Sequence, residues 1–397
     1  MRSRQAIYLY LIFFSAGFAI LANAQRFPEL QHQLNISKGA FGTYVGLAAI
    51  GSFIAFIYGS RIIHLFGIRK TLIFAPTGLY LSIGIIPHLH SSVTFILVNI
   101  FFGFFATLNH ISINAQGIHS ENKLNKLLLP FLAGVWSFGA LSTSILATLI
   151  AKDVSLCWHI DFVSATSWLL SIFAIIKLND DLMKPQEEYE AAPKVTIKSA
   201  FAPFKYMPAF TYGYILIVQA EFSTGDWSAI YAHDTLRASV SQSAICFLFF
   251  MITMATFRMI THKINFRFSE AQLMKNVTRL GATGFILFLI SATMTAKSHK
   301  TLALFFAVIA FIFLGFGSSF MVPLMFGIGT RRSNAMPGAV IAAIGLVSTT
   351  ESIITRTLIS WVAEATNLTI ALMIPALMLF GGSKLSVFGD TSPKEIS

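Results

Sequence analysis

The sequence predicts an all-α membrane protein with twelve transmembrane helices, arranged as two six-helix bundles related by pseudo-symmetry. Apolar residues make up 55% of the 397 positions and charged residues only 11%, against about 25% charged residues in soluble domains. The apolar residues form long runs, each close to the ~20 residues that a helix needs to cross a bilayer. Six runs precede one long polar stretch and six follow it, which is the layout of two parallel repeats.

The expected helices follow one another with short connections, so that neighbours along the chain should be antiparallel. The first run follows a basic N-terminus, and Ala22-Asn23-Ala24 weakly matches a signal-peptide cleavage site, but the eleven later runs indicate a retained helix. The expected spans are 7–25, 40–63, 71–88, 93–117, 128–150, 158–177, 208–231, 242–261, 276–296, 301–328, 336–362 and 368–388.

The long polar stretch divides the chain into an N-terminal bundle (1–178), a cytoplasmic linker (179–206) and a C-terminal bundle (207–397). The composition of the linker is that of a solvated tether and not of a folded domain. In span 10, Pro323 with its neighbouring glycines predicts a bend or a static kink.

The net charge of +11 could indicate a nucleic-acid partner, but its distribution indicates a membrane topology. With the N-terminus inside, most of the 28 basic residues fall on the cytoplasmic side, as the positive-inside rule requires. Both termini are then cytoplasmic. Arg258 is counted among those cytoplasmic residues, and Arg356 is assigned to the interior of a span. The two cysteines predict neither a disulfide framework nor a metal site.

Charges inside the spans are costly and usually face a bundle interior or water. Glu221 lies near the middle of span 7, and Glu351 lies in span 11. A buried carboxyl group that titrates near ambient pH could carry a proton between the two sides of the membrane. We therefore predict proton-coupling roles for Glu221 first and Glu351 second. The alternative is that Glu221 only bonds a neighbouring helix.

Two further charges lie near the expected outer ends of spans 1 and 7, which are equivalent in parallel repeats. Arg26 and Asp226 could pair as an outer gate that forms in one state and breaks in the other. The alternative is that each is an ordinary interfacial residue.

Arg356 in span 11 is a candidate for binding an anionic or carboxylate-bearing substrate through bidentate hydrogen bonds. The alternative is a structural ion pair with Glu221, Glu351 or Asp226. Glu351 and Arg356 are five residues apart, about 140° around a helix, so they do not share one face.

Amide, imidazole and indole groups inside the spans suit a polar neutral ligand such as a sugar, although interhelical hydrogen bonds are the competing explanation. His110 and Asn114 are four residues apart and share a helix face. The candidate substrate-binding residues besides Arg356 are Asn23, Asn109, His110, Asn114, Gln116, Trp136 and Gln219.

The plan resembles the major facilitator superfamily over the whole chain, with a degraded signature between spans 2 and 3, where the sequence reads Gly59-Ser-Arg-Ile-Ile-His64-Leu-Phe-Gly67-Ile-Arg69-Lys70. His64 stands where the signature has an acidic residue. The resemblance implies a conformational latch here, with gating roles for His64 and Arg69.

A closer resemblance is to the bacterial YbjJ-like branch, which is related to fucose-type sugar permeases. It rests on Ala24-Gln-Arg-Phe-Pro28, Asn114-Ala-Gln-Gly117, Ala220-Glu221 with Asp226-Trp227, and Gly315-Phe-Gly-Ser-Ser319. The branch implies an inner-membrane transporter without an agreed substrate.

Together these features predict a secondary active transporter that moves a small polar organic solute, sugar-like or carboxylate-bearing, by alternating access with proton coupling. The expected partners are the solute, protons and the bilayer, and the expected state is a monomer in a bacterial inner membrane. Export of amphipathic compounds is the alternative within transport, and a membrane sensor or assembly partner is the alternative outside it. No cofactor is expected. The sequence contains no phosphate loop, metal-ligand spacing or nucleophile–base motif that would indicate an enzyme.

Overall fold

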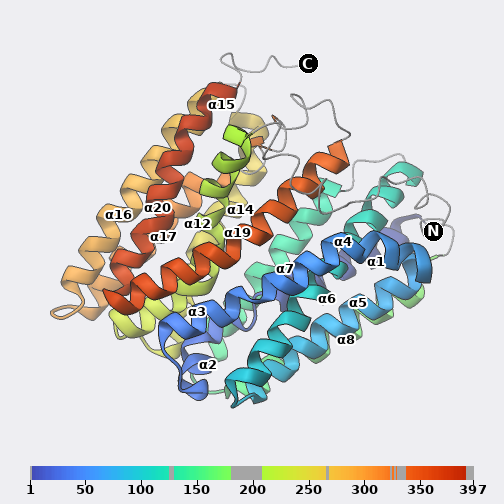
Figure 1. The fold of residues 1–397 in the computed structure, drawn as a ribbon, viewed down its shortest axis with the longest axis horizontal. Helices are drawn as coiled ribbons and strands as arrows, with labels where there is room; N and C mark the ends of the chain where they lie inside the picture. Colours follow the sequence, from blue (N-terminus) through green and yellow to red (C-terminus); the bar gives the residue numbers. More distant parts are fainter. Residues whose placement is uncertain are drawn as a thin grey trace. The chain divides into compact units, whose positions relative to one another are not determined.

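The structure is a computed structural model that describes residues 2–124, 129–179, 208–264, 268–321, 324–325, 328 and 337–389. The described residues that have regular structure are all helical, which confirms the all-α prediction (Figure 1). The chain divides into two compact units. The first comprises Met1–Ile36 and Tyr44–Thr196, and the second comprises Ser37–Thr43 and Ile197–Ser397.

The first unit is built around a long N-terminal helix, α1. This helix packs against α7 and α8, while α4 packs against α6, and α5 against both α6 and α8. Leu9, Phe13, Leu72 and Leu132 lie in the core between these helices, where each is almost inaccessible. The helices and helical turns that lie wholly or partly in this unit are α1 (Arg2–Ile20), η1 (Ala24–Arg26), α2 (Phe27–Leu34), α3 (Lys38–Gly46), α4 (Ala48–Phe66), α5 (Ile68–Ile85), η2 (Ile86–His88), α6 (Ser92–Leu124), α7 (Leu129–Ile150) and α8 (Leu156–Lys177).

The second unit packs α16 closely on α17, and α12 on α14, α19 and α20. An added Cβ at Gly281 of α16 would lie 2.3 Å from the Cα of Gly317 in α17, so these two backbones touch. The elements of this unit are α12 (Pro208–Ile230), the π-helical turn η4 (Tyr231–Thr235), α13 (Val240–Ser243), α14 (Ile245–Ile264), α15 (Glu270–Gln272), the π-helical turn η5 (Leu273–Val277), α16 (Thr278–Thr295), α17 (Lys300–Ser319), α19 (Pro337–Ala365), α20 (Leu368–Gly382) and η6 (Ser383–Phe388).

Ten helical stretches within the described part of the chain are long and apolar enough to cross a membrane. Expected spans 7 and 11 are also helical, as α12 and α19, and these two helices carry buried charges. Many large apolar side chains on the spans are exposed, among them Phe101, Leu149 and Leu169. An apolar surface on closed helices is what a lipid environment requires, because every backbone polar group is satisfied within its own helix.

Two expected spans differ in detail from the structure. Span 1 ends at Ile20 of α1, and the 3₁₀ turn η1 and α2 continue the chain. Span 2 is two helices, α3 and α4, interrupted at Leu47, and the beginning of α3 belongs to the second unit. The structure does not test the predicted bundle boundaries, which stay a prediction. Nearly all of the predicted linker, and Pro323, lie outside the described residues.

Candidate functional site

Helix α12 carries two carboxylates, and each is paired with an arginine from a different helix of the second unit. Glu221 forms an ion pair with Arg258 of α14. Asp226 accepts hydrogen bonds from Arg356 of α19, with Nε at 2.5 Å from Oδ2 and a terminal nitrogen at 3.2 Å from Oδ1. The guanidinium of Arg356 also lies over the ring of Phe222, 5.6 Å from its centroid. The two arginines offset the charges that α12 brings into the bundle.

Glu351 of α19 has a different environment, because the partners of its carboxylate are neutral. The amide of Gln219 donates to one carboxylate oxygen, and the hydroxyl of Thr355 donates to the other. Glu351 is only 9% exposed, and Gln219 is fully buried. The Oε1 atom of Gln219 is buried and has no hydrogen-bond partner within the described part of the chain. A buried acceptor without a donor is unusual in proteins, and this one belongs to an amide that already holds Glu351.

The spacing of these residues explains which helix each one faces. Gln219 and Asp226 are seven residues apart, two turns of helix, and so they lie on one face of α12, where both contact α19. Glu221 is about 200° around the helix from Gln219 and contacts α14 instead. The contacts run from Gln219–Glu351 to Asp226–Arg356, so α12 and α19 run in the same direction. This order matches the parallel course that expected spans 7 and 11 should have.

Among the described residues of the first unit, Arg26 is the most buried charged side chain, with an exposed fraction of 1%. It forms an ion pair with Glu29 of α2, where one terminal nitrogen lies 2.8 Å from Oε1. It also lies 3.1 Å from Nδ1 of His159 and donates to the carbonyl of Val154 at 3.1 Å. Arg26 and Asp226 thus each have partners inside their own unit. Their pairing as a gate stays a prediction.

The predicted polar residues of α6 form two lines, His110 with Asn114 on one face and Asn109 with Gln116 on another. The amide of Asn114 donates to the His110 carbonyl at 2.8 Å, and that of Gln116 donates to the Ser120 hydroxyl at 3.0 Å. His110 is exposed and Asn114 half-buried, whereas Asn109 and Gln116 are buried. His110 and Asn114, which share one face, are therefore the predicted residues of α6 that a solute could reach within the first unit.

The other predicted residues of the first unit lie apart from one another. The amide of Asn23 donates to the Ile83 carbonyl of α5 at 3.3 Å, and Trp136 of α7 packs against the core around α1. His64 lies near the end of α4, while Arg69 of α5 donates to the carbonyl of Ile176 at 3.1 Å. Gly67 between them has a φ of 78°, the left-handed backbone that favours glycine. The structure does not test the roles of these residues.

Sequence reasoning counted Arg258 among the cytoplasmic basic residues and named no partner for it. The residue lies inside α14, six positions before its end, and pairs with Glu221. A signal was present, since Arg258 falls inside expected span 242–261 and a charge within a span is a candidate functional residue. Glu29 was also missed, although a spacing of three residues on a helix from Arg26 is a common ion-pair spacing.

Comparison with known proteins agrees with this architecture. The sequence profile of the Major Facilitator Superfamily matches residues 7–355. The chain is 22% identical over 383 residues to an uncharacterised MFS-type transporter of Yersinia pestis, covering 94% of this chain and 93% of that protein. It is 20% identical to an uncharacterised transporter of Sinorhizobium fredii, over 89% of this chain and 90% of the relative.

Solved structures share the fold at low sequence identity. A mutant of the nucleoside transporter NupG superposes with a TM-score of 0.77 at 14% identity, covering 96% of this chain and 99% of the other. A D-xylose–proton symporter gives a TM-score of 0.67 at 16% identity, with 96% and 95% coverage.

The fold and the profile define a multi-pass membrane transporter and not an enzyme. The chain belongs to the major facilitator superfamily, whose members are secondary transporters of small molecules.

Proposed function

We propose that this protein moves a small, neutral, hydroxylated solute by alternating access, coupled to protons through Glu351. The observation that carries the proposal is the environment of Glu351, a buried carboxyl group bonded by two neutral side chains beside a spare amide oxygen. The sequence ranked Glu221 first for this role, whereas the contacts favour Glu351.

The chemistry of the partners favours Glu351 as the proton carrier. A hydroxyl group both donates and accepts, and an amide offers an acceptor on one atom and donors on the other. Thr355 and Gln219 can therefore hold Glu351 when it is ionised and, after rotating, when it is protonated. Arg258 has donors only, so protonation of Glu221 would break its ion pair and leave a partly buried arginine without its partner.

The pairing of Arg356 with Asp226 favours a neutral solute over a carboxylate-bearing one. An anionic substrate would have to displace Asp226, which already takes two nitrogen atoms of the guanidinium. The nucleoside and xylose transporters with the same fold are consistent with this choice. His110 and Asn114, which are accessible on α6, are the proposed contacts in the first unit.

The finer classification is part of the same proposal. The segments quoted for the YbjJ-like branch support membership of that branch, and the distribution of basic residues supports cytoplasmic termini in a bacterial inner membrane. One bundle pair encloses one pathway in this superfamily, so we propose a monomer.

The test is solute-driven proton movement in proteoliposomes, with a pentose, a nucleoside, a sugar acid and an amphipathic cation as probes. The pentose or the nucleoside should drive proton flux in the wild-type protein. Glu351→Gln should abolish that flux while solute exchange at equal concentrations continues, because exchange does not require the proton to leave. The matched control is Glu364→Gln, an exposed glutamate of the same helix, and it should leave the solute-driven proton flux unchanged.

Other outcomes would contradict the proposal. Proton flux that survives in Glu351→Gln but not in Glu221→Gln would restore the order expected from the sequence. Flux driven only by the sugar acid would indicate an anionic substrate, and flux driven only by the amphipathic cation would indicate an exporter. If none of the probes moved, a sensor or assembly role would gain support.

A further inference from the structure

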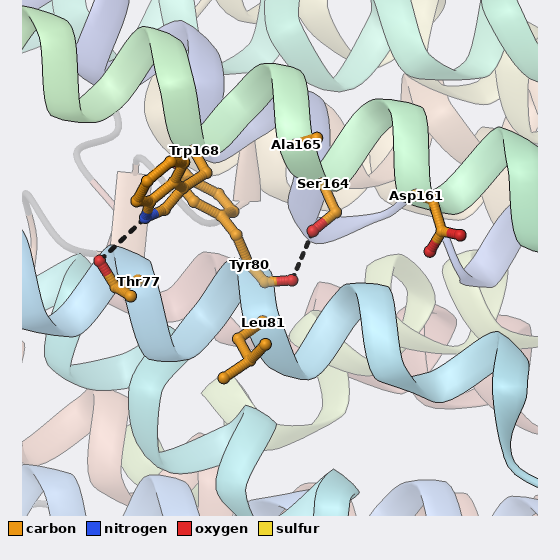
Figure 2. Close-up of a pocket in the computed structure, with 7 residues that line it drawn as sticks. All are labelled: Thr77, Tyr80, Leu81, Asp161, Ser164, Ala165 and Trp168. Carbon is orange, nitrogen blue, oxygen red and sulfur yellow. Dashed lines mark hydrogen bonds between the residues drawn. The ribbon is translucent and has the colours of Figure 1, made fainter.

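A groove of about 440 Å³ lies between α5 and α8 of the first unit (Figure 2). Its volume lies within the range of about 300–1,000 Å³ that is typical of ligand pockets. The groove is open along one side, since Leu81 is 62% and Trp168 is 39% exposed. The residues that line it are Thr77, Tyr80, Leu81, Asp161, Ser164, Ala165 and Trp168.

The polar groups along the body of this groove are bonded within the protein. The indole of Trp168 donates to the Thr77 hydroxyl at 3.0 Å, and the Ser164 hydroxyl donates to the carbonyl of Tyr80 at 2.6 Å (Figure 2). The hydroxyl of Tyr80 donates to Ser15 at 3.2 Å. With these donors in use, the groove presents mainly apolar surface. Such a wall suits a hydrocarbon chain better than a sugar, whose hydroxyl groups would lose their hydrogen bonds to water.

One end of the groove differs, because it carries a carboxylate. Asp161 lies in the first turns of α8, and both its oxygens are 3.1 Å from Nε2 of His88 at the end of η2. The side chain of Asp161 is 43% exposed, so this contact leaves it accessible. Gly84 allows α5 to approach here, since an added Cβ would lie 3.0 Å from Oγ of Ser164. The groove therefore combines a long apolar wall with an anionic end.

We infer that this groove binds one phosphatidylethanolamine molecule, with an acyl chain along Leu81 and Trp168 and the ammonium group on Asp161. A membrane-spanning protein meets lipid on such a surface, and the anionic end complements an ammonium group. The primary ammonium group of phosphatidylethanolamine can donate N–H hydrogen bonds to a carboxylate. The headgroup of phosphatidylglycerol has no positive charge and cannot form this ion pair. In the expected topology, Asp161 and His88 both lie near the non-cytoplasmic ends of their spans, at the depth of a lipid headgroup.

The test uses the full-length protein in liposomes with phospholipids that carry a photoreactive acyl chain, followed by mapping of the labelled peptides. Phosphatidylethanolamine should label residues 77–81 and 161–168 roughly fivefold more than phosphatidylglycerol with identical chains, the ratio that an accessible ion pair of ~1 kcal/mol supplies. Asp161→Asn should reduce the labelling to the phosphatidylglycerol level. Ala165→Phe should lower the labelling by both lipids, because the new ring fills the groove.

Asp153→Asn is the matched control, since Asp153 is exposed in the turn before α8 and does not line the groove. It should leave the preference unchanged. Equal labelling of the wild-type protein by the two lipids would overturn the inference and indicate ordinary surrounding lipid only. A preference that persists in Asp161→Asn would also overturn it, because the headgroup would then be held elsewhere. The wild-type comparison does not depend on whether any variant folds, and none of these outcomes depends on the transported solute.

Discussion

Removal of either charge of the Asp226–Arg356 pair should lower the unfolding free energy at least as much as removal of both charges together. The side chains are 11% and 19% exposed, respectively, so either substitution leaves a charge largely buried without its partner. Breaking a buried pair in this way costs ~3–5 kcal/mol. The residual exposure of both groups points to the lower end, about 3 kcal/mol, against a typical total stability of about 5–15 kcal/mol.

The perturbations are Asp226→Asn, Arg356→Gln and the double variant. Unfolding free energies would be measured by titrating detergent-solubilised protein with a denaturing detergent, following helix content. Each single variant should lose about 3 kcal/mol. The double variant should lose no more than either single variant, because two neutral amides replace the two charges. The coupling free energy is then about 3 kcal/mol, at the upper end of the range for contacting residues.

Asp153→Asn is again the control, because this exposed carboxylate should change stability by less than about 0.5 kcal/mol. A double variant whose loss equals the sum of the two single losses would refute the reasoning. Such additivity would mean that the two groups act independently and that neither charge offsets the desolvation cost of burying the other.

Two further predictions concern packing and charge in the second unit. Gly281→Ala should destabilise the protein by ~1–3 kcal/mol relative to Gly134→Ala. The added Cβ at position 281 would meet the backbone of Gly317, whereas nothing lies within 4 Å of a Cβ at Gly134. Equal melting temperatures of the two variants would exclude the close approach of Gly281 to Gly317. Glu364 lies beyond the expected end of span 11, and hydrogen bonds from the backbone N–H of Gly39 and then from a serine hydroxyl lower its pKa below the ordinary 4.5. A carboxyl group whose pKa is lowered in the folded state stabilises the protein fully above pH 4.5. This stabilisation is lost as the pH falls through the pKa of the folded state. Glu364→Gln should therefore lower the melting temperature at pH 7 and have little effect at the acid end; a difference that does not depend on pH would contradict this assignment.

The fold was predictable because the bilayer imposes a simple rule on the chain. A backbone in hydrocarbon must satisfy its own hydrogen bonds, so each long apolar run has to become a helix. Within the described residues, each expected span corresponds to one helix, or in the case of span 2 to two, with end shifts such as the one at Ile20. The interruption at Leu47 between α3 and α4 was not predicted, since no proline or charge marks that position.

The candidate site was predictable only as a set of residues. A charge within a span is rare and expensive, and this rule selected Glu221, Asp226, Glu351 and Arg356 without any structure. It should also have selected Arg258, which falls inside expected span 242–261 but was counted with the cytoplasmic basic residues.

The sequence by itself determined the class of the protein, its helical spans and the charges that those spans must accommodate, because hydropathy and helix length depend on local composition alone. Only the tertiary structure decided which charges meet. Asp226 and Arg356 are 130 positions apart in the chain, and Gln219 reaches Glu351 over 132. Such contacts depend on the rotation of each helix about its axis and on which helices are neighbours. Interhelical packing sets both, and no local pattern in the sequence records them.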